Sequence, residues 1–175
     1  MPTRRQFFVV GVVGAGVLVA TRLLDRRDGL PEPPLRALDA RAARIARALV
    51  PAVLANALPA SPEARAAATR EVVEAFDRAV SGLAPAVQSE IADLFGLLGF
   101  APTRILLTGL GNAWDEATEA DVRAFLTRWR TSRFDLLRAG YQAITQLLIA
   151  SWYGNPASWE RIGYPGPPAL GARPA

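Results

Sequence analysis

The chain has 175 residues and a formal net charge of +4, and it contains neither cysteine nor histidine. These two absences exclude disulfides, a thiolate nucleophile and a Cys-X-X-Cys-His haem attachment, and they remove the side chain that most often serves as general base or metal ligand. All basic residues are arginines and most of the excess charge lies near the N-terminus, so the rest of the chain is close to neutral, with no basic stripe or motif for binding nucleic acid.

The N-terminal segment has the layout of an export signal. Two adjacent arginines are followed, after one residue, by two phenylalanines: Arg4, Arg5, Phe7 and Phe8. An uncharged stretch then runs to Ala20, as in a signal peptide, and the arginine pair resembles a bacterial twin-arginine signal. The resemblance predicts recognition by the twin-arginine translocase, which carries folded proteins. The alternative is an ordinary secretory signal or a short membrane anchor, and no clear cleavage site shows whether residues 1–24 are removed.

A linker and one helical domain are expected after the signal. Residues 25–34 are charged and then proline-rich, as in a linker. Residues 35–153 show helical periodicity and no strand alternation, which predicts an all-α domain, a single bundle of five or six helices. We expect helices over about 35–57, with a kink at Pro51, and over 61–81, 85–99, 118–130 and 133–153, with a shorter one over 102–107.

The apolar residues of two helices predict how they pack. In the helix over 85–99 one face should point inward: Val87, Ile91, Leu94, Phe95 and Leu98. In the last helix a row of inward residues is widened on both sides: Leu136, Leu137, Tyr141, Ala143, Ile144, Leu147, Leu148 and Ala150. So broad an apolar sector is typical of a helix that others surround, and we therefore predict that 133–153 is the central helix.

The C-terminal segment, residues 154–175, differs in composition from the helical domain. It is rich in glycine and proline and contains large aromatic residues, so no regular helix is expected, yet it is too apolar for a free tail. Either Trp159 and Tyr164 fold back onto the bundle, or the segment docks on another protein, since tryptophan and tyrosine often dominate interfaces. The residues themselves leave both readings open.

This segment also carries a family resemblance. Trp152-Tyr153-Gly154-Asn155-Pro156, followed by Trp159 and Ile162-Gly163-Tyr164-Pro165-Gly166-Pro167, resembles the C-terminal signature of the small (gamma) subunits of FAD-dependent sugar and alcohol dehydrogenases, related to gluconate 2-dehydrogenase subunit 3. Members of that family usually begin with a twin-arginine signal, as this chain does at Arg4-Arg5. The helical middle agrees only in length and class.

The resemblance implies a non-catalytic subunit of a periplasmic complex, held at the membrane if its signal is not cleaved. The large subunit of such a complex holds FAD and performs the chemistry, and a cytochrome subunit, where present, passes electrons to the membrane. The small subunit supplies the export signal and aids assembly. Family members can carry cysteines near the electron-transfer route, and their absence here argues against an electron relay through this chain. We expect the C-terminal block to lie against the large subunit and to contact it through Trp152, Tyr153, Asn155, Pro156, Trp159, Gly163, Tyr164 and Pro165.

Two other functions are compatible with the residues. One is a self-standing helical protein of the periplasm or membrane surface that binds a ligand. The other is an enzyme, which would have to use acids that lie in no recognisable pair with a base or metal partner: Asp77, Glu90, Asp93 and Asp135. Solvated helix charges are the ordinary explanation for such acids. We therefore predict no catalytic residue, cofactor or metal ligand in this chain.

Overall fold

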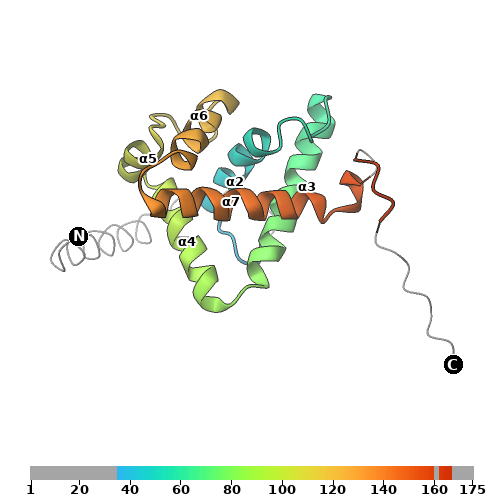
Figure 1. Cartoon of the computed structure of the whole chain (residues 1–175), viewed down its shortest axis with the longest axis horizontal. Coiled ribbons are helices and arrows are strands. Elements are labelled where there is room, and N and C mark those ends of the chain that lie inside the picture. Colours follow the sequence, from blue (N-terminus) through green and yellow to red (C-terminus); the bar gives the residue numbers. More distant parts are fainter. Residues whose placement is uncertain (1–34, 160–161, 167–175) are drawn as a thin grey trace.

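The structure, a computed structural model, describes residues 35–159 and 162–166. The described part is an all-α bundle without strands (Figure 1), which confirms the predicted fold class. Its helices are α2 (Ala40–Val53), α3 (Pro62–Ser81), α4 (Pro85–Gly99), α5 (Ala101–Thr108), α6 (Glu119–Arg130), α7 (Asp135–Tyr153) and the short 3-10 helix η2 (Pro156–Ser158). The predicted signal over 1–24 and linker over 25–34 lie outside the described residues.

The central helix is α2. Several of its side chains are fully buried, among them Ile45, Leu49 and Val50, and it packs against α3, α4, α6 and α7. The prediction that the last helix is central is therefore wrong. Figure 1 shows α7 crossing in front of α2, α3 and α4 on one side of the bundle. One of the two flanks of its apolar sector faces solvent instead of protein.

The exposed flank of α7 corrects part of the predicted core. Leu136 is 82% exposed, and Ala143 and Ala150 are exposed as well, whereas Ile144 and Leu148 are buried as expected. In α4 the prediction fails for Val87, which is 40% exposed because it lies in the first turn, at the tip of the α3–α4 hairpin.

Local capping residues define the helix ends. Ser61 caps α3, with its side chain accepting the backbone N–H of Ala64 (3.3 Å), and Thr118 and Asp121 form a capping box at the start of α6. The first helix is shorter than predicted because Asp39 caps it, accepting from the backbone N–H of Ala42 (2.7 Å). Pro51 lies in the last turn of α2, and the helix continues past it to Val53. The proline therefore does not divide this helix in two.

Three aromatic side chains join α6 to the loop and short helix beside it. Phe125 packs edge-on against both Trp114 and Trp129, with ring centroids 6.0 Å and 4.9 Å away. Each indole N–H is satisfied: Trp114 donates to the carbonyl of Leu98 and Trp129 to that of Leu107, both at 2.8 Å. These bonds fix α4 and α5 relative to α6, since buried indoles need a hydrogen-bond partner.

Asp77 is a buried carboxylate that holds the chain where it enters α2. Its side chain, on a residue only 2% exposed, accepts the backbone N–H groups of Arg36 (2.8 Å), Ala37 (2.9 Å) and Leu38 (2.9 Å). Burial raises the pKa of Asp77, but the three backbone hydrogen bonds and the charge of Arg36 outweigh burial and hold this pKa below its usual value. The ionised side chain therefore ties residues 36–38 to α3.

Changing Asp77→Asn in the full chain should lower the free energy of unfolding by about 1–3 kcal/mol near neutral pH. The amide is a weaker acceptor, and its NH₂ group meets backbone donors. Because the folded-state pKa is depressed, the carboxylate's contribution is complete above the unfolded-state pKa of about 3.9 and is lost as the pH falls through the folded-state pKa.

Urea unfolding at several pH values checks this prediction. The difference between wild type and Asp77→Asn should be constant from about pH 7 to pH 5 and narrow in acid. The exposed Glu90→Gln variant is the control and should differ from wild type by less than about 0.5 kcal/mol near neutral pH. A difference that widens as the pH falls would show that the sign of the Asp77 shift is wrong.

Candidate protein-binding surface

The outer face of α7 carries no charged side chain after its first turn. The sequence has no charged residue between Arg138 and Glu160. Six of the exposed positions of α7 follow helical spacing: Leu136, Ala139, Ala143, Gln146, Ile149 and Tyr153. Exposure is 41% at Ile149 and 39% at Tyr153, besides the 82% at Leu136. We call these six residues the outer α7 face. A helix surface that faces only water is normally rich in charge.

The neighbouring helices show that ordinary pattern. The exposed residues of α3 include five charged ones: Glu63, Arg70, Glu71, Glu74 and Arg78. Those of α6 include three arginines: Arg123, Arg128 and Arg130. The exposed residues of α3 and α6 therefore differ from those of α7, which are uncharged after its first turn. Exposed apolar patches often mark interaction sites in soluble proteins, which makes the outer α7 face a candidate for one.

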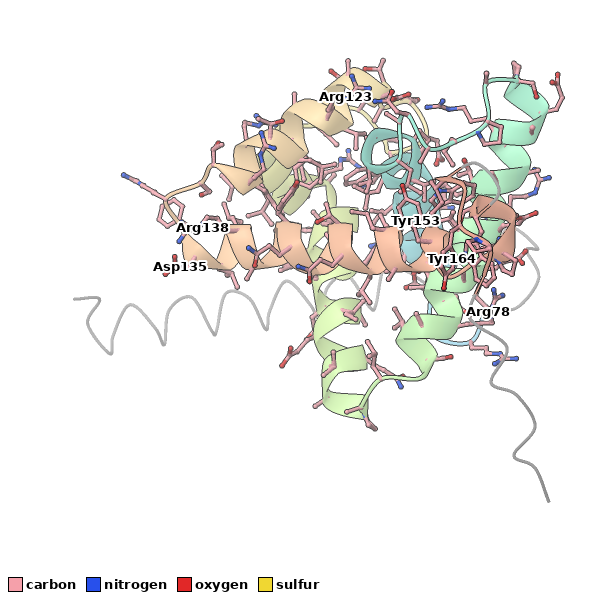
Figure 2. All side chains as sticks on the ribbon, turned by 45° about the vertical axis from the view of Figure 1, so that its right-hand side comes forward. Arg78, Arg123, Asp135, Arg138, Tyr153 and Tyr164 are labelled. Atoms are coloured by element: carbon pink, nitrogen blue, oxygen red, sulfur yellow. The ribbon has the colours of Figure 1, made fainter. Side chains whose placement is uncertain are left out.

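An aromatic block follows α7 directly, and we use this name for residues 153–159 and 162–166. The Trp159 indole N–H donates to the backbone carbonyl of Tyr153 (2.8 Å), and the Trp159 ring lies edge-on to that of Tyr164, with centroids 5.4 Å apart. Gly166 has φ of +97°, and a Cβ there would lie 3.1 Å from the Trp159 ring, so glycine suits this position in both respects. Figure 2 shows Tyr153 and Tyr164 at the same end of α7.

Asn155 ties the aromatic block to the bundle. Its side-chain amide donates to the Glu71 carboxylate on α3 (3.0 Å), and its side-chain oxygen accepts the backbone N–H of Ala157 (3.1 Å) at the start of η2. Two polar contacts at opposite ends of one amide thus fix the turn after α7. The block continues the outer α7 face because Tyr153 belongs to both.

The predicted contact residues fall into two groups. Trp152 is 3% exposed and packs in the core, so the prediction that it contacts a partner is corrected: its ring belongs to the inner face of α7. The other seven lie wholly or partly at the surface: Tyr153, Asn155, Pro156, Trp159, Gly163, Tyr164 and Pro165. Whether they contact a partner stays a prediction.

The two readings of the C-terminal segment are partly combined in the structure. Trp159 is half-buried and folds back onto the end of α7, as the first reading expects. Tyr164 and Ile162 remain 45% and 55% exposed, which leaves apolar surface for contact with another protein. The rings therefore shape the block and still present part of it outward.

Sequence reasoning missed two residues of this surface, Leu136 and Ile149, whereas Ile162 is part of the predicted C-terminal signature. Leu136 was assigned to the core because helical periodicity alone does not say which side of a broad apolar sector is covered. The absence of charge from Ala139 to Trp159 was the available signal, since a solvated helix of this length would normally include charged residues.

The candidate acids do not form a reactive group. Asp77 is tied to backbone N–H groups, Asp135 pairs with Arg138 within the first turn of α7, and Glu90 and Asp93 lie at or near the surface of α4. Within residues 35–159 and 162–166, no group of three or more acidic side chains could hold a metal ion.

None of the described helices is by itself long and apolar enough to cross a membrane. Only α4 and α5 taken together reach that length and composition, and they bend by 92° at their junction.

The chain was compared with protein-family models, curated proteins and solved structures, and no match was found in any of the three. The resemblance to dehydrogenase small subunits therefore stays a prediction from the residues at the two ends of the chain.

Two tryptophans seven positions apart should respond differently to truncation. Trp152→Ala removes a core ring and should cost about 3–5 kcal/mol, which lowers the Tm of a chain of this size by roughly 10 °C or more. The pair Trp159→Ala with Tyr164→Ala removes two partly exposed rings, which pack edge-on against each other and are joined to α7 by the bond from Trp159 to the Tyr153 carbonyl, so the Tm should fall by about 3 °C or less.

Thermal unfolding of the isolated full chain, followed by far-UV circular dichroism, makes this comparison. The helical signal of the double variant should match that of wild type before the transition. If the double variant melts as early as Trp152→Ala, the aromatic block is part of the core, and its role as a contact surface is excluded.

Proposed function

We propose that this chain is a non-catalytic small subunit of a periplasmic FAD-dependent sugar or alcohol dehydrogenase. In this proposal it binds the flavoprotein subunit, which has no signal of its own, and supplies the twin-arginine signal that exports the pair. Arg4 and Arg5 carry the address, and the flavoprotein holds the FAD and the substrate.

The observation that carries this proposal is the uncharged surface formed by the outer α7 face and the aromatic block. A helix of 19 residues is about 28 Å long, which is long enough to span a protein interface of ordinary size. Aromatic and aliphatic side chains at its two ends, with alanine and glutamine between, would let a partner approach the helix closely. The central part of a stable protein interface is typically apolar and depleted of charged residues.

The residue content supports an accessory role in place of catalysis. Cysteine and histidine are absent from the whole chain. The four acids considered as catalytic candidates are engaged in structural contacts or lie singly on α4: Asp77, Glu90, Asp93 and Asp135. Binding and export need a contact surface and an export signal. In this proposal the outer α7 face and the aromatic block supply the surface, and Arg4 and Arg5 supply the signal.

A single carboxylate on the outer α7 face should abolish binding of the flavoprotein. Ala143→Glu would bury an unpaired charge in the interface, and we expect a loss of at least about 2 kcal/mol, or roughly thirtyfold in affinity. The exposed position means that the free energy of unfolding of the chain itself should change by less than about 0.5 kcal/mol.

The matched control is Ala86→Glu, the same substitution at an exposed position in the first turn of α4. Tagged wild type and both variants are purified from periplasm, and the flavin absorbance of each eluate is measured. Wild type and Ala86→Glu should retain the flavoprotein and Ala143→Glu should not. If wild type elutes without flavin, the chain is not a dehydrogenase subunit, and a self-standing helical protein becomes the better description.

Replacement of both Arg4 and Arg5 by lysine tests the proposed export signal. Lysine keeps the charge but lacks the planar guanidinium with its fixed donors. We expect both this chain and the flavoprotein to stay in the cytoplasm, as judged by cell fractionation and immunoblotting. Delivery of the flavoprotein to the periplasm by this double variant would contradict export through the signal of this chain.

A further inference from the structure

A groove between α2 and α3 lies outside the surface described so far. Its volume is about 660 Å³. Its apolar lining comes from α2, from α3 and from Leu35, which lies before α2 in the chain: Leu35, Pro51, Pro62, Ala66 and Val73. Three of these five are proline or alanine, so a bound chain could approach the helix backbones closely. The size lies within the range of ligand and peptide sites.

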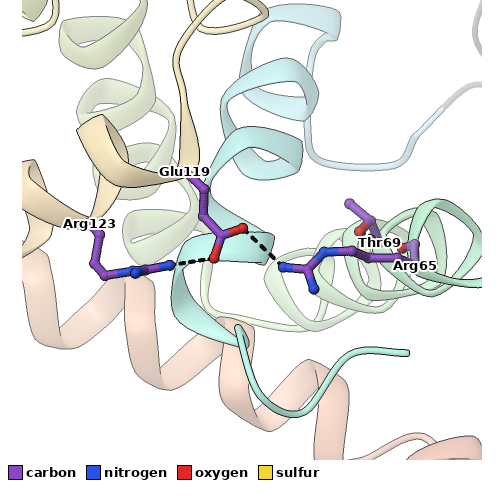
Figure 3. A network of polar contacts seen from close by, with 4 residues as sticks. All are labelled: Arg65, Thr69, Glu119 and Arg123. Atoms are coloured by element: carbon purple, nitrogen blue, oxygen red, sulfur yellow. Dashed lines mark hydrogen bonds and ion pairs between the residues drawn. The ribbon is translucent and has the colours of Figure 1, made fainter. Parts of the chain in front are cut away.

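The rim of the groove carries three arginines, Arg47, Arg65 and Arg70, and one acid, Glu74. Arg47 already has an interaction partner within the chain. Arg65 is held by Glu119 of α6 at 3.0 Å, and the same carboxylate pairs with Arg123 (Figure 3), so one acid is shared by two arginines. Arg70 is exposed and forms no ion pair with any residue of the described segments. An occupant with a carboxylate would complement this rim, since arginine binds carboxylates through paired hydrogen bonds.

The walls of the groove determine how an occupant would bind. Both walls are helices, whose backbone N–H groups are already bonded within the helix, and Pro51 and Pro62 have no N–H at all. Pairing as an added β-strand is therefore not available. The groove can recognise a segment only through apolar contact on its floor and charge at its rim, which fits an extended or polyproline-like arm.

Residues of α3 link the groove to the aromatic block. Glu74 lines both the groove and a hollow of about 410 Å³ between α3 and the end of α7, whose lining also includes Glu71 and Asn155. Asn155 in turn belongs to the aromatic block. A protein bound to that block would thus lie one helix width from the groove.

We propose that the groove between α2 and α3 binds an acidic, proline- or aliphatic-rich arm of the same subunit that covers the outer α7 face. This inference rests on the proposed function. The arm places its apolar side chains over Val73 and Ala66 and a carboxylate against Arg70. The arm binds the small subunit on the α3 side, and the outer α7 face forms the main contact with the flavoprotein.

A photo-crosslinking residue in place of Ala66 identifies the occupant directly. The variant is purified as the complex with its flavoprotein and irradiated, and the crosslinked peptide is sequenced by mass spectrometry. The expected product joins position 66 to a segment of the large subunit that contains aspartate or glutamate beside proline or aliphatic residues. A crosslink to residues upstream of Leu35 in this chain, to a second copy of this chain, or to no peptide overturns the proposal.

Two variants measure what the groove contributes to binding. Ala66→Trp fills the floor and Arg70→Glu reverses the rim charge, and each should weaken the complex about tenfold. Their controls on α4 are Ala86→Trp and Glu90→Arg, exposed positions that line neither the groove nor the hollow beside it. The controls should bind the large subunit like wild type, and all four variants should keep the wild-type circular dichroism spectrum.

The pattern of results separates this inference from the proposed function. If Ala143→Glu loses the flavoprotein but Ala66→Trp and Arg70→Glu bind it like wild type, the groove proposal fails and the proposed function stands. If the wild-type chain binds no flavoprotein, both fail together. Weaker binding by the groove variants, combined with the crosslink to an acidic arm, supports both.

Discussion

Burial of α2 is the constraint on which the rest of the structure depends. Its buried side chains are small or branched, three of them alanine, and this lets four other helices approach it closely: Ala42, Ala43, Ile45, Ala46, Leu49 and Val50. Each of those four helices turns its own apolar residues toward α2. What the molecule presents to its surroundings is therefore decided by the outer faces of α3, α4, α6 and α7.

Packing against α2 does not explain why the outer α7 face lacks charge. The inner side of α7 already fills its share of the core with Ile144, Leu148 and Trp152. Charged residues on the opposite side would leave those contacts unchanged and would make the helix more soluble, as they do on α3 and α6. A requirement from outside the chain is a better physical explanation, and it is the reason why α7 is the centre of the proposed function.

The sequence allowed good prediction of what depends on near neighbours and poor prediction of what depends on distant ones. Ser61 and Thr118 cap their helices through contacts within three residues, so the pattern was enough. Leu136 was misplaced because periodicity groups residues on a face without showing which neighbour covers it. Composition was enough to locate the aromatic block. It could not show that Trp152 is buried while Trp159 is only half-buried, because that depends on which part of the bundle the end of α7 contacts. The role of Asp77 depends on partners about 40 residues earlier in the chain, and no local pattern reports such a contact.

Asp77 also fixes the first described residues of the chain. The carboxylate fixes residues 36–38 to α3, and Leu35, immediately before them, lines the groove on the α2 side of that helix. The aromatic block is bonded to the other side of α3 through Glu71. The first described residues and the proposed partner surface are thus held on two flanks of one helix. Because the three hydrogen bonds to Asp77 join segments far apart in sequence, this arrangement exists only once α3 has folded against the start of α2. A twin-arginine route, which carries folded proteins, would meet the signal on a chain whose partner surface has already formed.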